Sequence, residues 1–227
     1  MVTPDTVNEE DIDKLIIPDD LPNELVFKAY IEATVYDREG HIIQYHKQPM
    51  RSLTQYFLAL MSIPIIGTYQ NASTNNAPSI LVNVLGLPSQ QSTYIAANPS
   101  YNGANIVWDW TIQVGSGTQA FSPTLNSLAA PIANGSGAGQ LTYDSVIISS
   151  SGTSISTTIT VINYTSDAIN VTEIGLVGTI YVQYQNSSNA YATVTKTFLL
   201  SYDTFSTAIS IPAGSPAAFK ITISFAG

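Results

Sequence analysis

Residues 25–36 read LVFKAYIEATVY, and their apolar and polar side chains alternate with a period of two. Successive side chains of a β-strand point to opposite faces of a sheet, so this pattern predicts a strand with one buried face. The members of the apolar set are Phe27, Ala29, Ile31, Ala33 and Val35. Residues 219–225, FKITISF, repeat the alternation near the other end of the chain. Both ends of the folded body are therefore predicted to be half-buried strands.

The residues after the first strand predict a hairpin and then a short helix. Residues 37–40 fit a tight turn in which Gly40 takes a positive φ, and residues 41–46 return as the partner strand. The sequence after Pro49 places apolar side chains at i, i+3, i+4, i+7 and i+8, which is the spacing of one helix face. We therefore expect one helix, over about residues 50–63.

Strands and loops account for nearly everything after Gly67. The expected strands are residues 80–84, 106–114, 143–149, 156–164, 174–184, 192–200, 208–211 and 219–225. Residues 68–79 and 89–103 are among the expected loops, because they are rich in Gly, Ser, Asn and Pro. About ten strands with one helix predict an all-β fold, an antiparallel β-sandwich of jelly-roll type, with a closed barrel as the alternative.

Charge is concentrated at the amino-terminal end. Residues 1–51 hold sixteen Asp, Glu, Lys and Arg side chains, whereas the following 176 residues hold seven. Residues 1–24 are predicted to form an acidic extended arm, either solvated or ordered by a partner. Residues 25–227 are predicted to form a single β-sandwich domain. Ordinary globular proteins are about one-quarter charged, so this polar, nearly uncharged body suggests a surface meant for neighbouring subunits.

The composition also argues against several classes of partner and site. The net charge of -9, with only seven Lys and Arg, opposes binding to nucleic acid. The absence of cysteine removes disulfides, thiolate metal sites and thiol nucleophiles. The apolar stretch at residues 53–66 is interrupted by polar residues and is about five residues short of a bilayer span. We expect no nucleic-acid partner and no membrane span.

Five carboxylates of the body are candidates for acid–base chemistry: Asp109, Asp144, Asp167, Glu173 and Asp203. Glycoside hydrolysis requires two carboxyl groups within roughly 5–10 Å of each other. No two of the five have a spacing that places them together on one strand face, and several fall at strand ends, where Asp shapes turns. We expect Glu173 to accept hydrogen bonds from a turn or to meet Lys196 or Lys220 across the sheet.

Other motifs have a structural interpretation. Trp108 and Trp110 share a strand face with apolar neighbours, which favours a core position over a sugar-stacking platform. His41 and His46 occupy odd and even positions of one strand, so they face opposite ways and do not share a metal. The sequence contains neither a GxSxG nucleophile elbow nor a phosphate-binding loop. We predict a non-enzymatic protein with no catalytic, cofactor or metal site.

Two groups of residues are candidates for modification or contact. Asn-x-Ser/Thr triplets without proline are acceptors for glycosylation, and they begin at Asn71, Asn134, Asn163, Asn170 and Asn186. Tyrosines offer flat amphipathic contacts, and those expected in long loops are Tyr69, Tyr94, Tyr101 and Tyr191. We hypothesise glycosylation for the first group and interaction with a partner for the second.

The carboxyl-terminal quarter resembles a pattern of virion structural domains. Residues 171–176, VTEIGL, look like its strand signature, and residues 199–205, LLSYDTF, look like its turn, with Ser201 and Tyr202 where a basic residue is common. Residues 209–225 resemble its final hairpin, with a Pro-Ala-Gly turn and a last alternating strand. The composition is similar to that of structural proteins of viruses that infect hyperthermophilic archaea. The resemblance implies a jelly-roll subunit in an extracellular particle assembled in the host cytoplasm.

The leading functional hypothesis is a non-enzymatic virion structural protein that assembles with itself and with other coat proteins at a capsid vertex, turret or tail base. An uncharged polar surface is desolvated against a neighbour more cheaply than a charged one. The alternative is a glycan- or receptor-binding module of a tail fibre or surface adhesin, with a host-surface glycan as its partner. A hydrolase on the same sandwich is the third class.

Overall fold

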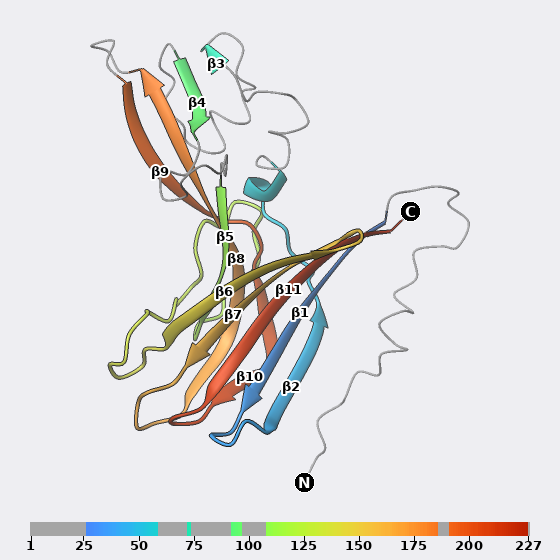
Figure 1. The fold of residues 1–227 in the computed structure, drawn as a ribbon, viewed down its shortest axis with the longest axis vertical. Coiled ribbons are helices and arrows are strands. Elements are labelled where there is room, and N and C mark those ends of the chain that lie inside the picture. The colour runs from blue at the N-terminus through green and yellow to red at the C-terminus, as the bar shows by residue number, and fades with distance from the viewer. Residues whose placement is uncertain (1–25, 59–71, 74–91, 97–107, 186–190, 227) are drawn as a thin grey trace.

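The computed structural model describes residues 26–58, 72–73, 92–96, 108–185 and 191–226. Within these residues the chain is nearly all antiparallel β-structure, in two sheets with one short helix (Figure 1). The expectation of an all-β fold with two antiparallel sheets is confirmed. The predicted arm at residues 1–24 and the predicted strand at residues 80–84 lie outside the described residues.

The first sheet has five strands. Their order is β2 (Ile42–Pro49), β1 (Val26–Tyr36), β11 (Pro216–Ala226), β7 (Ser154–Ile162) and β6 (Thr142–Ser151). β1 and β11 are the two stretches that alternate most regularly in sequence, and they pair with each other at the centre of this sheet. Ile31 lies opposite Ile221, and both side chains are buried. The alternation therefore identified the buried face correctly.

The second sheet has six strands built around one long strand, β8 (Ile169–Gln185). The first half of β8 pairs with β10 (Asp203–Ile211) and β5 (Trp108–Gly115). Its second half pairs with β9 (Tyr191–Leu199) and β4 (Ser92–Ala96), and β3 (Ala72–Ser73) pairs with β4. In Figure 1 the far end of β8, with β9, β4 and β3, extends beyond the part where the two sheets face each other.

β3 and β4 correct the sequence prediction, which assigned residues 68–79 and 89–103 to loops. Both strands are short, and apart from Ile95 and Tyr94 their residues are Ser, Thr and Ala. A short polar segment has no apolar alternation to reveal it. β4 becomes a strand because the backbone of β8 is available beside it, which is a contact between distant parts of the chain.

The main core lies between the two sheets. Ala33, Phe219 and Ile159 form one row across β1, β11 and β7, and all three are buried. The side chains that meet this face from the second sheet include Ile112, Val114, Ile174, Leu176 and Ile209. Burying one such large apolar side chain stabilises the fold by about 1.5–3 kcal/mol, so these rows hold the sheets together.

The helix begins later than predicted. Residues 55–58 are helical, whereas residues 50–54 are not. The backbone N–H of Thr54 donates to the carbonyl of Leu200 at 2.9 Å, and Leu53 forms a β-bridge with Ser201. Extended backbone at these positions pairs with a distant segment, so it is not available for a first helical turn. The predicted remainder of the helix, residues 59–63, lies outside the described residues.

The core interpretation of Trp110 is confirmed. Its side chain packs against the main core, and its ring centroid lies 6.3 Å from that of Phe57. Ile112 and Val114, on the same face of β5, are buried. The side chain of Trp108 lies outside what the structure describes. No helix among the described residues has the length and apolar character needed to cross a membrane.

Candidate functional site

Glu173 is a fully buried carboxylate on β8 that holds a loop against the outer face of the six-stranded sheet. Its side chain accepts hydrogen bonds from the backbone N–H groups of Ala130 at 2.7 Å, Ala129 at 3.0 Å and Gly117 at 3.3 Å. Three N–H dipoles stabilise the buried carboxylate in the absence of a cation within this cluster. The expectation that Glu173 accepts hydrogen bonds from a turn is confirmed.

The loop held by Glu173, residues 115–131, is closed at its base by backbone hydrogen bonds. The N–H of Ser116 donates to the carbonyl of Ala130 at 2.9 Å. On β8, the hydroxyl of Thr172 donates to the carbonyl of Gly117 at 2.7 Å. A second, smaller core joins the loop to the sheet, and its buried members are Leu128, Leu199 and Tyr202. The loop is thus a packed part of the fold.

A β-bulge interrupts the strand between β9 and β10 beside this loop. The N–H groups of Leu200 and Ser201 both donate to the carbonyl of Leu176, at 2.7 and 3.3 Å. The Ser201 hydroxyl accepts a hydrogen bond from the Leu176 N–H at 3.1 Å. The extra residue keeps Leu200 in the main core and Tyr202 in the smaller core. Gly175 passes so close that a Cβ there would lie 2.9 Å from the Ser201 carbonyl oxygen.

Asp203 is the second buried carboxylate, and it begins β10 directly after the bulge. Its two carboxylate oxygens accept hydrogen bonds from the backbone N–H of Arg51, at 3.2 and 3.4 Å. Burial raises the pKa of Asp203 to about 7. The backbone N–H and the positive charge of Arg51, together with the backbone N–H of Ser52, lower this pKa but do not outweigh burial. Asp203 therefore titrates close to neutral pH.

The two buried carboxylates lie on opposite faces of the six-stranded sheet. Asp203 lies opposite Ile174 on β8, whereas Glu173 lies opposite Thr204. Adjacent residues of a strand point to opposite faces, so Asp203 lies on the face of Ile174, toward the main core, and Glu173 lies on the face of the loop. Tyr202 directly precedes Asp203 in the sequence. Its hydroxyl accepts the N–H of Gln119 at 2.8 Å, and burial, followed by the nearby charge of Glu173, raises its pKa.

The other three body carboxylates are dispersed. Asp144 is exposed at an irregularity in the pairing of β6 with β7. Asp167 is exposed and accepts a hydrogen bond from the Ser166 hydroxyl at 3.2 Å. Asp109 is half-buried on β5.

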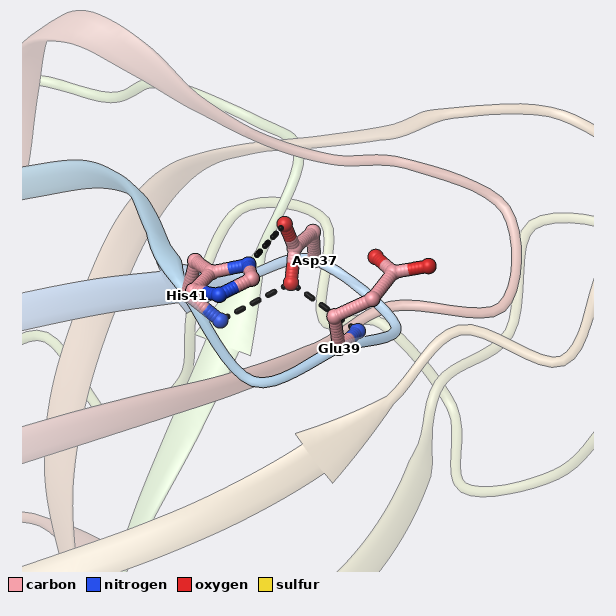
Figure 2. Close-up of polar contacts among 3 residues, drawn as sticks. All are labelled: Asp37, Glu39 and His41. Carbon is pink, nitrogen blue, oxygen red and sulfur yellow. Dashed lines mark hydrogen bonds and ion pairs between the residues drawn. The ribbon is translucent and has the colours of Figure 1, made fainter.

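A group of potential metal ligands, which the sequence reasoning missed, gathers in the turn between β1 and β2 (Figure 2). One ligand atom from each of Asp37, Glu39 and His41 lies within 4.8 Å of the others. The Asp37 carboxylate accepts the backbone N–H groups of His41 at 2.8 Å and Glu39 at 2.9 Å, and it lies 3.0 Å from His41 Nδ1. Slight burial raises the pKa of Asp37, but the contacts with His41 outweigh it and lower the pKa. These contacts make the carboxylate a turn cap.

The two histidines lie apart, as predicted. His41 is exposed in the turn, whereas His46 is part-buried on β2, with Nε2 2.9 Å from Gln48 Oε1. The His46 ring meets the Phe205 ring edge-on at 5.5 Å. The Asp-x-Glu-x-His spacing at residues 37–41 is the sequence signal for the turn cluster, whereas the prediction considered only His41 with His46.

The sequons differ in accessibility. Asn163 is fully buried, and its amide nitrogen donates to the carbonyls of Asp167 and Ile211 at 2.8 and 2.9 Å. In the folded chain Asn163 therefore has no free nitrogen to carry a glycan. The exposed sequon residues are Asn134 and Asn170, while Asn71 and Asn186 lie outside the described residues.

The four candidate interaction tyrosines fall where the structure gives no side-chain contact. Tyr69 and Tyr101 lie outside the described residues. Tyr94 belongs to β4 and Tyr191 to β9, so these two lie on strands where the sequence predicted a loop or a loop end. Their interaction with a partner stays a prediction.

Exposed apolar side chains gather on the two outer strands of the five-stranded sheet. On β2 they are Ile42, Ile43 and Tyr45, and on β6 they are Val146, Ile147 and Ile148. Outer strands present unpaired N–H and C=O groups, so apolar side chains there invite pairing with another strand. No protein-family model, curated protein or solved structure matches this chain. Among the described residues, the outer strands β2 and β6 each carry three exposed large apolar side chains.

Proposed function

We propose that this chain is a non-enzymatic virion structural protein that assembles with itself and with other coat proteins, at a capsid vertex, turret or tail base. The observation that carries the proposal is the exposure of apolar side chains along the outer strands of the five-stranded sheet. A soluble protein that works alone usually protects such strands with charges, proline or a covering segment. The virion setting follows the resemblance of the carboxyl-terminal quarter to virion structural domains.

The outer face of the β7–β6 half of that sheet supports the same proposal. It is covered by hydroxyl groups that bond to one another, such as Ser149 with Ser156 and Ser154 with Ser224, both at 2.8 Å. Paired hydroxyls lose little when water is removed, whereas a charged side chain loses its hydration. This face is therefore suited to contact with a neighbouring subunit.

The buried carboxylates favour a structural role. Both Glu173 and Asp203 accept hydrogen bonds from backbone amides that belong to the fold. We assign the sandwich to the jelly-roll type because the chain crosses between the sheets from β2 to β3, from β5 to β6, from β7 to β8 and from β10 to β11. Jelly-roll sandwiches are a common architecture of viral coat subunits.

Mass photometry and size-exclusion chromatography of the full chain test the proposal. We expect species larger than one chain whose population grows with concentration. Antibodies against the chain should also label particles released by cells that carry its gene. A strict monomer at high concentration, together with unlabelled particles, would overturn the proposal.

A further inference from the structure

We infer that β6 is an assembly edge: a second copy of this chain places its own β6 antiparallel against it, across a two-fold axis near Ile147. The inference deepens the proposed function, since it names the strand and the partner through which self-assembly begins.

Among the strands that the structure describes, β7 alone pairs with β6, so the other edge of β6 is open. β6 is the last strand of the five-stranded sheet, and its neighbour there is β7. Residues 145–151 read SVIISSS and contain none of the Lys, Asp, Glu or Pro residues that blunt a strand edge. The one irregularity of its pairing with β7 lies before this run, between Tyr143 and Ser145. Seven consecutive residues thus form a regularly paired edge whose other side has no partner strand among the described residues.

The rows of side chains that are buried on β1, β11 and β7 continue onto β6, but their β6 members are exposed to solvent. Ile159 on β7 is 2% exposed, whereas Val146, its partner on β6, is 47% exposed. In the next row Thr157 is 2% exposed and its partner Ile148 is 58% exposed. Val146 and Ile148 lie on the face that is buried elsewhere in the sheet. A further strand against β6 would continue these rows and cover them.

The strand at the opposite edge of the sheet, β2, is tied to the second sheet by side chains. The amide of Gln44 donates to the carbonyl of Ala208 at 3.3 Å and accepts the N–H of Ser210 at 3.0 Å. The amide of Gln48 donates to the carbonyl of Thr204 at 3.2 Å. β2 also carries Lys47, a charge of the kind that blunts a strand edge, whereas residues 145–151 of β6 carry none. We therefore place the contact on β6 and not on β2.

Charge favours a second β6 as the occupant. The chain has a net charge of -9, so most contacts between two copies bring like charges together. The β6–β7 hairpin escapes this cost, because no charged residue lies between Asp144 and Asp167. In a pair centred on Ile147, Val146 of each copy faces Ile148 of the other on the apolar face. A two-fold axis satisfies both copies with the same contacts.

A single introduced cysteine tests this arrangement, because the chain has none of its own. Ile147→Cys places a thiol beside its own symmetry mate, at a spacing that directly opposite strand residues share with disulfides. Under mild oxidation we expect most of the Ile147→Cys protein to form a covalent dimer. Ile42→Cys is the matched control, since Ile42 is 61% exposed and Ile147 is 59% exposed, and it should stay mainly uncrosslinked.

A second pair of variants separates this inference from the proposed function. Ile147→Lys should weaken dimer formation in mass photometry at least tenfold, and Ile42→Lys should leave it unchanged. Both lysines lie on exposed strand positions, so the melting temperature should shift by no more than about 2 °C. Oligomers that resist Ile147→Lys and crosslink only when Ile147→Cys and Ile42→Cys proteins are mixed would overturn the β6–β6 pairing but keep self-assembly. A wild-type chain that stays monomeric would overturn both.

Discussion

Glu173 illustrates how one residue holds a whole loop, residues 115–131, in place. Its carboxylate has two oxygens for three backbone N–H groups of the 115–131 loop. In the variant Glu173→Gln, one oxygen is replaced by an NH2 group that points at N–H donors. We expect the free energy of unfolding, measured by urea denaturation, to fall by about 2–3 kcal/mol.

The control for this change is Glu32→Gln, which removes the half-exposed ion pair of Glu32 with Lys220, 3.4 Å apart. A pair of this kind contributes about 1 kcal/mol or less. Equal losses in the two variants would contradict the role assigned to Glu173.

Asp203 makes stability depend on pH near neutrality. Its pKa is about 7 in the folded chain, against a reference value of 3.8. The folded state holds the proton more tightly, so the stabilisation is complete below pH 3.8 and is lost as the pH rises toward about 7. From these values, the Asp203 carboxyl group should lower the free energy of unfolding of the wild type by about 2–3 kcal/mol as the pH rises from 5 to 8. The variant Asp203→Asn should lack this part of the decline when the free energy of unfolding is measured by urea titration at each pH. A variant with the same pH dependence as the wild type would refute the role of Asp203.

At the scale of elements, the bulge between β9 and β10 depends on the glycine opposite it. A Cβ at Gly175 would press on the backbone oxygen of Ser201 and on the Leu199 side chain, whereas the three atoms nearest to a Cβ at Gly178 would be side-chain atoms of Leu200. A backbone atom within a paired strand is displaced less easily than the end of a side chain. We expect Gly175→Ala to lower the free energy of unfolding by about 1–3 kcal/mol, and Gly178→Ala by less. The reverse order in thermal or urea denaturation would contradict this account of the bulge.

The elements that could be predicted from sequence are those whose signal is local. Alternation revealed β1 and β11, and the turn residues revealed the hairpin in which Gly40 has a φ of 89°. β3, β4 and the true start of the helix depend on backbone partners far away in sequence, so no local pattern encodes them. The candidate site divides in the same way: the amide-bound role of Glu173 was predicted, but the identity of its loop was not.

At the scale of the whole molecule, the two edge strands of the five-stranded sheet differ. Glutamines of β2 bond to β10, while β6 leaves its last core rows uncovered and pairs with β7 alone among the described strands. Within the five-stranded sheet, the charged side chains lie mainly on β1, β2 and the turn between them, as in the contact of Lys47 with the ring of Tyr30 at 5.4 Å. The β6 edge therefore combines few charges with exposed apolar side chains, which is the combination expected of an assembly surface.

Sedimentation velocity of the wild-type chain across a range of concentrations, at about 0.1 M and about 1 M NaCl, tests the central claim most directly. Salt screens repulsion between chains of like net charge and strengthens apolar contact, so an uncharged assembly surface predicts association that grows with concentration and is stronger at high salt. A single species with the mass of one chain at every concentration and both salt levels would contradict the claim.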